Sequence, residues 1–289
     1  MWVLATLIAA LAQTGRNAAQ AGLTGQIGTI GATAVRFVFG LPFAALFLLV
    51  MSTQSALPPV SAATLGWTAL GAFSQIAATA FMLVTMRGQG FGVATALMKT
   101  EPVTLAVFGV LFLSEPLGLP RLGAILLATF GVILMSGANW SRARATSIAI
   151  GIAAGALFGL SAIGFRGAIL TLPDGGPVLR ASVVLVIALA MQSAAMLAWL
   201  GLLDRAVLRA IARSWRISLA AGALGAFASL FWFIGFALTS AANVRTLALV
   251  EVIFAQILSA RLFRQGASLR QMTGMAMIVA GVILLIRVA

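Results

Sequence analysis

Three charged residues lie within long apolar stretches of this 289-residue sequence: Lys99, Glu101 and Glu251. On insertion scales a charge at the centre of a membrane-spanning helix costs about 2.5–3.5 kcal/mol, so such residues usually face a partner or a water-filled cavity. An ammonium group can bind a carboxylate as a point charge, and a carboxylate can carry a proton or hold an ammonium group. These residue types predict a site for a small charged molecule or a proton.

Lys99 and Glu101 each have a structural explanation beside the chemical one. They are two positions apart, so on a continuous helix they point about 200° apart and cannot pair with each other. Lys99 either binds a substrate carboxylate or forms a structural pair with a carboxylate such as Glu251. Glu101 either exchanges protons or holds an ammonium group, or it anchors helix packing beside Pro102, which kinks the helix and frees a backbone carbonyl.

Polar and aromatic residues on other apolar stretches could line a cavity with these charges. Gln13 and Asn17 are four apart and share one helix face. Trp232, together with Phe231 and Phe233, could form an aromatic wall, and the indole N–H of Trp232 needs a partner. Each residue serves equally well as a contact between helices. The predicted substrate-binding residues are Lys99, Gln13, Asn17, Gln75, Met98, Ser161, Phe165, Ser229, Trp232 and Asn243, with Thr14, Thr95 and Thr246 as further polar positions.

The residue types that are missing exclude several kinds of chemistry. The sequence has no His and no Cys, and its five acidic residues form no metal-binding carboxylate motif. Imidazole or thiolate metal sites, nucleophile–base pairs and disulfides are thereby excluded. A GxxxxGK[ST] loop for ATP is also absent. We therefore expect neither an enzyme nor a bound cofactor or metal.

The composition identifies the elements that must position these residues. Hydrophobic residues make up 62% of the chain and charged residues 8%, against about 45–50% and about 25% in soluble domains. Continuous apolar runs favour helices over a β-barrel, and the length accommodates about ten spans. The predicted helices cover residues 2–20, 28–50, 64–86, 90–112, 119–138, 147–169, 177–201, 217–239, 242–262 and 269–288.

The basic residues predict contact with lipid rather than nucleic acid. Of the 18 basic residues 17 are Arg, and most lie at the ends of apolar runs, where they can meet anionic headgroups. Arg16, Arg36, Arg180 and Arg245 are expected to snorkel to the interface, with substrate contact as the alternative. The polar segment 202–216 predicts a short amphipathic interfacial helix.

The two halves of the chain match weakly at offsets near 150. The matches are Ala69–Phe73 with Ala223–Phe227, Gly131–Leu134 with Gly281–Leu284, and Glu101 with Glu251. Each repeat contains an odd number of helices, five, so the second copy enters the membrane from the opposite side. We therefore predict an all-α polytopic membrane protein of ten transmembrane helices. Residues 1–140 and 141–289 form two inverted five-helix repeats of one membrane domain.

One predicted helix also carries a pattern of small residues. Gly151, Gly155 and Gly159 recur every four residues, which lets helix backbones approach closely.

The sequence resembles the EamA branch of the drug/metabolite transporter superfamily. The resemblance rests on Glu101-Pro102 in the fourth helix, Leu113-Ser114-Glu115 at its end and Gly123 with Gly131-Val132-Ile133-Leu134 in the fifth. The second half departs from this pattern, because Val252 rather than Pro follows Glu251 and Arg261 stands near the position of the closing Glu.

The resemblance implies a secondary transporter that exports small metabolites by alternating access through a central cavity in the inner (plasma) membrane. Amino acids are the best-represented substrate class of such relatives, which include aromatic amino acid exporters. The expected partners are a small-molecule substrate, a proton as candidate coupling ion and the lipid bilayer, without nucleic acid, for a monomer or homodimer. A non-transporting scaffold and a multidrug or nucleobase exporter are the alternatives.

Charge bias and resemblance disagree on orientation. Ten Arg residues lie on predicted loops opposite the termini and at most five on the terminal side, so the positive-inside rule places both termini outside. The resemblance implies cytoplasmic termini. The sequence leaves this alternative open.

Overall fold

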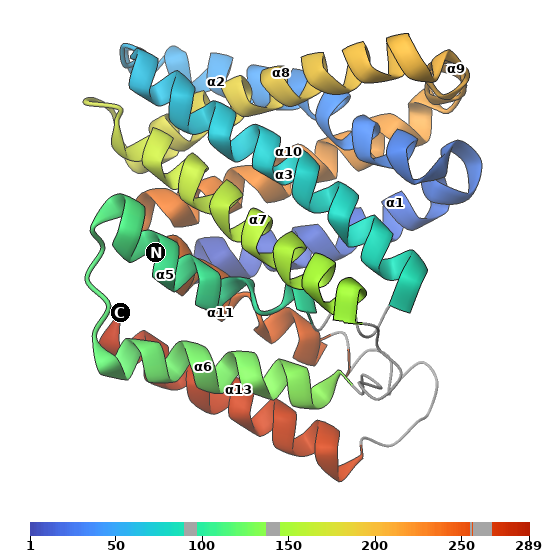
Figure 1. The fold of residues 1–289 in the computed structure, drawn as a ribbon. Coiled ribbons are helices and arrows are strands. Elements are labelled where there is room, and N and C mark those ends of the chain that lie inside the picture. The colour runs from blue at the N-terminus through green and yellow to red at the C-terminus, as the bar shows by residue number, and fades with distance from the viewer. Residues whose placement is uncertain (90–96, 137–144, 255, 257–267) are drawn as a thin grey trace. The chain divides into compact units, whose positions relative to one another are not determined.

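The structure, a computed structural model, describes residues 1–89, 97–136, 145–254, 256 and 268–289, and all regular secondary structure in these ranges is helical. The all-α prediction is confirmed for these ranges. The helices (Figure 1) are α1 (Trp2–Val38), α2 (Leu41–Ser52), α3 (Ala62–Gln89), α5 (Glu101–Leu113), α6 (Leu119–Met135), α7 (Ala145–Leu170), α8 (Pro177–Leu203), α9 (Arg205–Arg213), α10 (Trp215–Leu238), α11 (Ala241–Leu247) and α13 (Leu269–Val288).

Several of these helices are long and apolar enough to cross a bilayer. Within the described residues five meet that criterion: Ile27–Ser52, Ala145–Leu170, Pro177–Leu203, Trp215–Leu238 and Leu269–Val288. Glu101–Leu113 and Leu119–Met135 are shorter apolar helices. Parts of the predicted helices 90–112, 119–138 and 242–262 lie outside the described residues. The chain is thus a multi-pass membrane protein, and the number ten remains a prediction.

The chain divides into two compact units, and each unit draws on both halves of the sequence. Unit 1 contains Met1–Phe73 and Gly164–Leu238, and unit 2 contains Ser74–Ile163 and Thr239–Ala289. Helices α3 and α7 each contribute residues to both units. The predicted division at residue 140 describes a sequence repeat, whereas these units are defined by packing.

In unit 1 the first two predicted spans differ from their expected bounds. Helix α1 packs along α10 and continues through the loop expected at 21–27, with a kink at Gly28. Gly28 has φ 71° and ψ 172°, a conformation that glycine adopts without steric cost. The predicted helix 28–50 is instead interrupted at Phe39–Gly40. Pro42, in the first turn of α2, explains that interruption because it cannot donate a backbone hydrogen bond.

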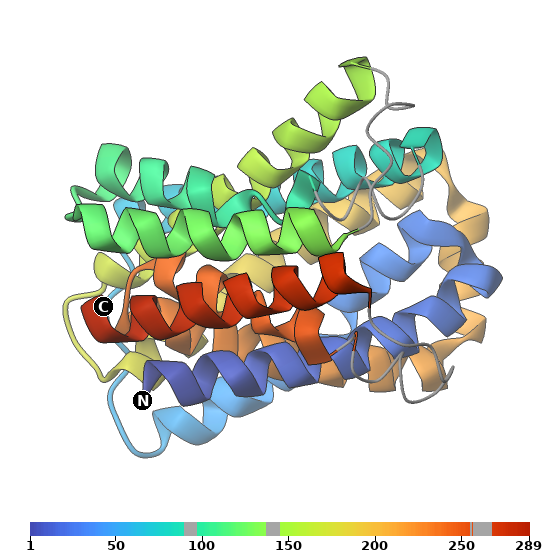
Figure 2. The same ribbon diagram turned by 90° about the horizontal axis from the view of Figure 1, so that it is seen from below.

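In unit 2, α6 and α13 lie side by side through small residues (Figure 2). A Cβ added at Gly131 would lie 2.7 Å from the Gly274 carbonyl oxygen, and one at Gly281 would lie 2.8 Å from that of Ala124. These contacts, 131 with 274 and 281 with 124, are related by the sequence offset of 150. A twofold axis between the two helices would produce this reciprocity.

The glycine pattern of α7 packs against the segment that leads into α5. A Cβ at Gly151 would lie 2.4 Å from Leu97 Cδ1, and one at Gly159 would lie 2.8 Å from Thr104 Oγ1. A Cβ at Gly155 would lie 3.2 Å from the Leu97 carbonyl oxygen. The close approach that the four-residue spacing predicts is therefore observed, and it sets the position of residues 97–104.

Gly131 provides a test of the α6–α13 contact. We expect Gly131→Ala to lower the free energy of unfolding by about 1–3 kcal/mol, because the added methyl group meets the Gly274 backbone. The measurement is SDS-titrated unfolding in mixed micelles.

Gly123 on the same helix is the matched control, since a Cβ there meets nothing within 4 Å. Gly123→Ala should raise stability by up to about 1 kcal/mol through helix propensity. Equal effects of the two substitutions would contradict the close contact.

Candidate functional site

Two ion pairs connect the segments around α5 and α11 in unit 2. Lys99 Nζ pairs with Glu251 Oε1, and Arg245 Nε lies 3.2 Å from Glu101 Oε1. The exposed fractions of the side chains are 24% for Lys99, 17% for Glu251, 17% for Arg245 and 15% for Glu101. These four residues, here named the charge quartet, carry no net charge and are partly accessible.

The quartet lies at two interruptions in helical structure. Residues 99–100 form a turn before α5, and residues 248–249 form a turn after α11. At both turns backbone bonds tighten to the i+3 pattern: Thr100 N–H donates to the Leu97 carbonyl at 3.2 Å, and Leu249 N–H to that of Thr246 at 3.1 Å. Short 3₁₀ stretches within helices often mark functional hinges. The interruptions fall at equivalent places in the two halves.

Each glutamate lies in the first turn of the helical segment that follows a turn. Glu101 is the first residue of α5, with Pro102 next, and Glu251 follows the turn at 248–249. A carboxylate is favoured at a helix N-terminus, where the backbone dipole is positive. Pro102 suits the first turn because its missing N–H would have no partner there. A kink is predicted at Pro102, and the structure places the interruption at residues 99–100, just before α5 begins.

The pairs cross between the two halves of the sequence. Lys99 precedes α5 and pairs with Glu251, which follows the second turn. Arg245 lies on α11 and pairs with Glu101, which follows the first turn. The glutamates are related by the offset of 150, but the bases are not, because Leu249 corresponds to Lys99 and Thr95 to Arg245. The acids are therefore symmetric and the bases are not.

A Lys99–Glu251 pair is one of the two interpretations of Lys99, whereas Arg245 is predicted to lie at the interface, with substrate contact as the alternative. The structure instead places Arg245 beside Glu101, with its side chain mostly buried. Arg16 also departs from the snorkelling prediction: it is buried, and its stem lies with that of Arg36 against Gly225 of α10. The sequence contains few acidic residues, and a buried glutamate needs a basic partner. That need is the sequence signal that could have indicated the pairing of Arg245 with Glu101.

Other predicted residues of unit 2 differ in what their polar atoms do. Asn243 is buried, and its Nδ2 donates to Thr239 Oγ1 at 3.0 Å. Among the described residues, Asn243 Oδ1 and Ser161 Oγ are buried without a hydrogen-bond partner. Met98 and Gln75 are half-buried. The hydroxyl of Thr246 bonds to the Ala242 carbonyl, and Thr95 lies outside the described residues.

In unit 1 the predicted indole partner is present. Trp232 Nε1 donates to Gln13 Oε1 at 3.0 Å, which joins α10 to α1. Trp232 and Ser229 are buried on α10. Asn17 lies within α1, but its side chain is outside the described residues. Thr14 donates to the Ala10 carbonyl.

The aromatic residues of unit 1 divide between its core and its surface. The Phe165 and Phe233 rings contact each other at a tilt of 34° with centroids 4.6 Å apart, and both are buried. Phe231 instead pairs with the exposed Phe227, at 4.9 Å. The two phenylalanines that flank Trp232 therefore make different ring contacts, and the aromatic wall remains a prediction.

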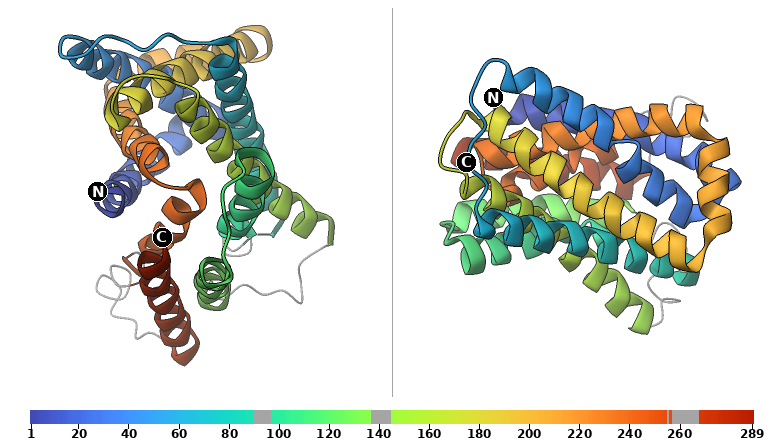
Figure 3. Two further views of the ribbon diagram at one scale, coloured as in Figure 1. Left: turned by 90° about the vertical axis from the view of Figure 1, so that its left-hand side faces the viewer. Right: turned by 90° about the horizontal axis from the view of Figure 1, so that it is seen from above.

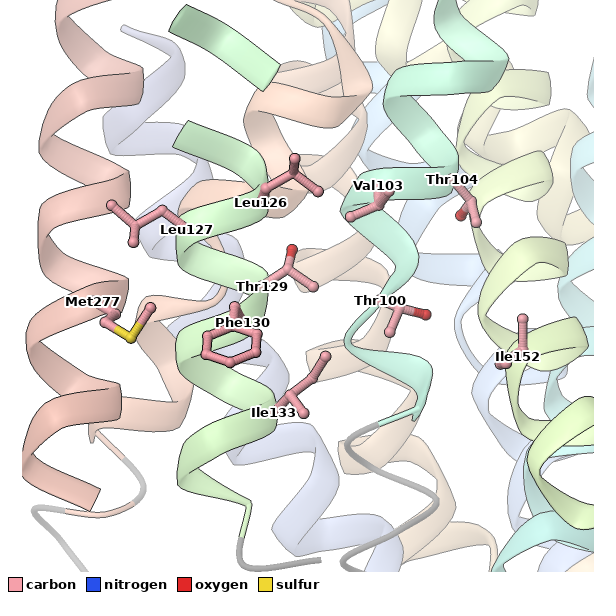
Figure 4. Close-up of a pocket in the computed structure, with 10 residues that line it drawn as sticks. All are labelled: Thr100, Val103, Thr104, Leu126, Leu127, Thr129, Phe130, Ile133, Ile152 and Met277. Atoms are coloured by element: carbon pink, nitrogen blue, oxygen red, sulfur yellow. The ribbon is translucent and has the colours of Figure 1, made fainter. Parts of the chain in front are cut away.

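A separate apolar groove of 730 Å³ lies in unit 2 (Figure 4). The residues lining it are Thr100, Val103, Thr104, Leu126, Leu127, Thr129, Phe130, Ile133, Ile152 and Met277. The Thr100 and Thr104 hydroxyls donate to backbone carbonyls, which leaves a largely hydrocarbon lining. None of the described residues that line this groove is a predicted binding residue, and local sequence pattern does not indicate the groove because four helices build it.

The helices, the paired internal charges and the interrupted segments define a multi-pass membrane protein with a polar centre in unit 2. A family model for the EamA-like transporter family matches residues 1–137 and 145–287. The chain therefore belongs to the EamA-like transporter family, whose members are membrane transporters of small molecules. This finding supports the family part of the resemblance, while the amino acid exporter subtype remains a prediction.

Solved structures support the fold. One, described only as the crystal structure of a protein, covers 100% of this chain and 97% of its own with a TM-score of 0.73. At 16% identity this likeness concerns the fold alone. No curated protein matches the chain.

The Lys99–Glu251 pair can be measured as a coupling energy. We expect Lys99→Met and Glu251→Gln each to lower the free energy of unfolding, because each leaves an uncompensated charge. The double variant should lose less than the sum, with a coupling of about 0.5–3 kcal/mol in SDS-titrated unfolding.

Lys99→Met combined with Glu115→Gln supplies the control, because Glu115 lies beyond the far end of α5. The two effects should add within about 0.5 kcal/mol. Equal coupling in both cycles would mean that the Lys99–Glu251 contact is not specific.

Proposed function

We propose that this chain exports small metabolites, amino acids being the substrate class, by alternating access through a central cavity in the inner (plasma) membrane. The observation that carries the proposal is the partly accessible Lys99–Glu251 pair at two helix interruptions in an EamA-like transporter. A membrane protein retains such charges where they face a partner or an aqueous path.

A zwitterion has the charges needed to exchange with this pair. Its carboxylate would replace Glu251 as the partner of Lys99, while its ammonium group would replace Lys99 as the partner of Glu251. Each protein charge then keeps an opposite charge throughout, which avoids the large cost of an unpaired ion in an apolar site. The Arg245–Glu101 pair would remain intact and hold the two segments during the exchange.

Buried polar atoms of unit 2 provide further candidate contacts. Asn243 Oδ1 and Ser161 Oγ, both buried, would accept hydrogen bonds from a substrate ammonium group or from water. We also propose substrate contacts for Met98 and Gln75 in unit 2, and for the unit 1 residues Gln13, Asn17, Phe165, Ser229 and Trp232. These contacts are to be tested residue by residue.

The interruptions supply a means of movement. An i+3 turn joins helical segments that can bend there at little cost in hydrogen bonding. Equivalent turns occur in both halves. In an inverted repeat, one half could therefore bend in the state open to one side of the membrane, and the other half in the state open to the opposite side. Alternating access would then involve bending at residues 99–100 and 248–249.

Transport by Lys99 variants tests substrate binding. We expect Lys99→Met to weaken saturable amino acid counterflow in proteoliposomes at least tenfold, because a hydrogen bond to a charged group contributes about 1.5–3 kcal/mol. The exchange variant Lys99→Glu/Glu251→Lys should recover stability but not transport, since the two charges are then reversed relative to the substrate.

Unchanged counterflow in Lys99→Met would remove the binding role. The wild-type panel should also contain nucleobases and cationic drugs. Counterflow of those solutes without amino acids would indicate a multidrug or nucleobase exporter, and failure of the whole panel would favour a scaffold.

Proton coupling is tested at Glu101. If this carboxylate exchanges protons, Glu101→Gln should retain counterflow yet lose the stimulation by an imposed pH gradient. Glu115→Gln should keep that stimulation. A Glu101→Gln protein that still responds to the gradient would limit Glu101 to packing beside Arg245.

A further inference from the structure

Helix α9 presents a row of arginines along one exposed face. Arg205, Arg209 and Arg213 follow one another at four-residue intervals, so they share that face, and all three are exposed. Arg216 follows directly, with its guanidinium 5.5 Å from the centre of the Trp215 ring. Together these four residues form a cationic surface, here named the arginine face.

The opposite face of α9 is fixed to unit 1. Ile211 is buried, and a Cβ added at Gly31 of α1 would lie 2.9 Å from Val207 Cγ1. The Asp204 carboxylate caps the helix by accepting from Val207 N–H at 3.2 Å. Arg205 Nε donates to the Gly201 carbonyl at 2.8 Å, at the end of α8. The arginine face is therefore held in place before any ligand binds.

The flanking segments give the depth of α9 in a bilayer. The end of α8 exposes Trp199 (55%) and Leu202 (81%), and the start of α10 exposes Trp215 (51%) and Ile217 (47%). Apolar side chains exposed on membrane-spanning helices contact lipid, and tryptophan is enriched at the boundary with water. Because α9 joins these two ends (Figure 3), it lies at headgroup level.

We propose that the arginine face binds the headgroups of anionic phospholipids. Arginine matches phosphate geometrically through paired N–H donors and remains charged at all relevant pH values. Asp204 is the one acidic residue of segment 202–216, so four arginines and one carboxylate leave this segment with a net charge of +3. This proposal goes beyond the transport function and stands independently of it.

The experiment measures lipid binding to the full chain. Purified protein is titrated with phosphatidylglycerol or phosphatidylcholine and bound lipid is counted by native mass spectrometry. Each basic residue near an anionic surface contributes about fivefold. We therefore expect Arg205→Gln/Arg209→Gln/Arg213→Gln to weaken phosphatidylglycerol binding by about a hundredfold and to leave phosphatidylcholine binding unchanged.

Two further variants separate the arginine face from general effects. Arg121→Gln/Arg270→Gln/Arg287→Gln removes the same charge from unit 2, and the triple Lys variant at 205, 209 and 213 keeps the charge. A loss above tenfold that is confined to the α9 Gln variant, with a melting temperature near wild type in phosphatidylcholine, supports the proposal. A smaller loss, an equal loss in the unit 2 variant, or absence of a preference in the wild type overturns it.

Discussion

The requirement that an intramembrane charge be paired governs the polar centre of unit 2. The Lys99–Glu251 and Arg245–Glu101 pairs use two of the chain's five acids, although 18 bases compete for them. Partial exposure lowers the desolvation cost of each ion, which in a dry interior can exceed the Coulombic gain. With exposed side-chain fractions between 15% and 24%, both pairs lie between a dry interior and full exposure to solvent.

Unit 2 combines rigid and bendable helix contacts. The α6–α13 contact brings backbone against backbone at Gly131 and Gly281, so sliding these helices would force main-chain atoms together. The segments at residues 99–100 and 248–249 have i+3 bonds and are linked by long side chains, which can rotate. The difference follows from residue size, because glycines let the backbones of α6 and α13 meet directly, whereas long side chains link the two turns.

The sequence predicted what depends on local pattern. Apolar runs predicted helices, the spacing of Gly151, Gly155 and Gly159 predicted close packing, and the polar segment 202–216 predicted α9. It did not predict the apolar groove or the pairing of Arg245 with Glu101, because both join segments distant in the chain. The interruption at Phe39–Gly40 was missed although Pro42 signalled it, since the surrounding apolar run suggested one continuous span.

The choice of base within the charge quartet is itself informative. Lys99 is the single lysine of the chain, whereas the other 17 bases are arginines. A guanidinium binds a carboxylate through a planar fork and loses little freedom in doing so, which suits the Arg245–Glu101 pair to a holding role. An ammonium group is a compact charge with rotatable donors, and it can transfer between carboxylates without matching a plane. Lys99 is therefore the base whose partner, Glu251, a substrate carboxylate could most readily displace. The two symmetric glutamates thus have different bases, and the lysine is at the pair where exchange is proposed to occur.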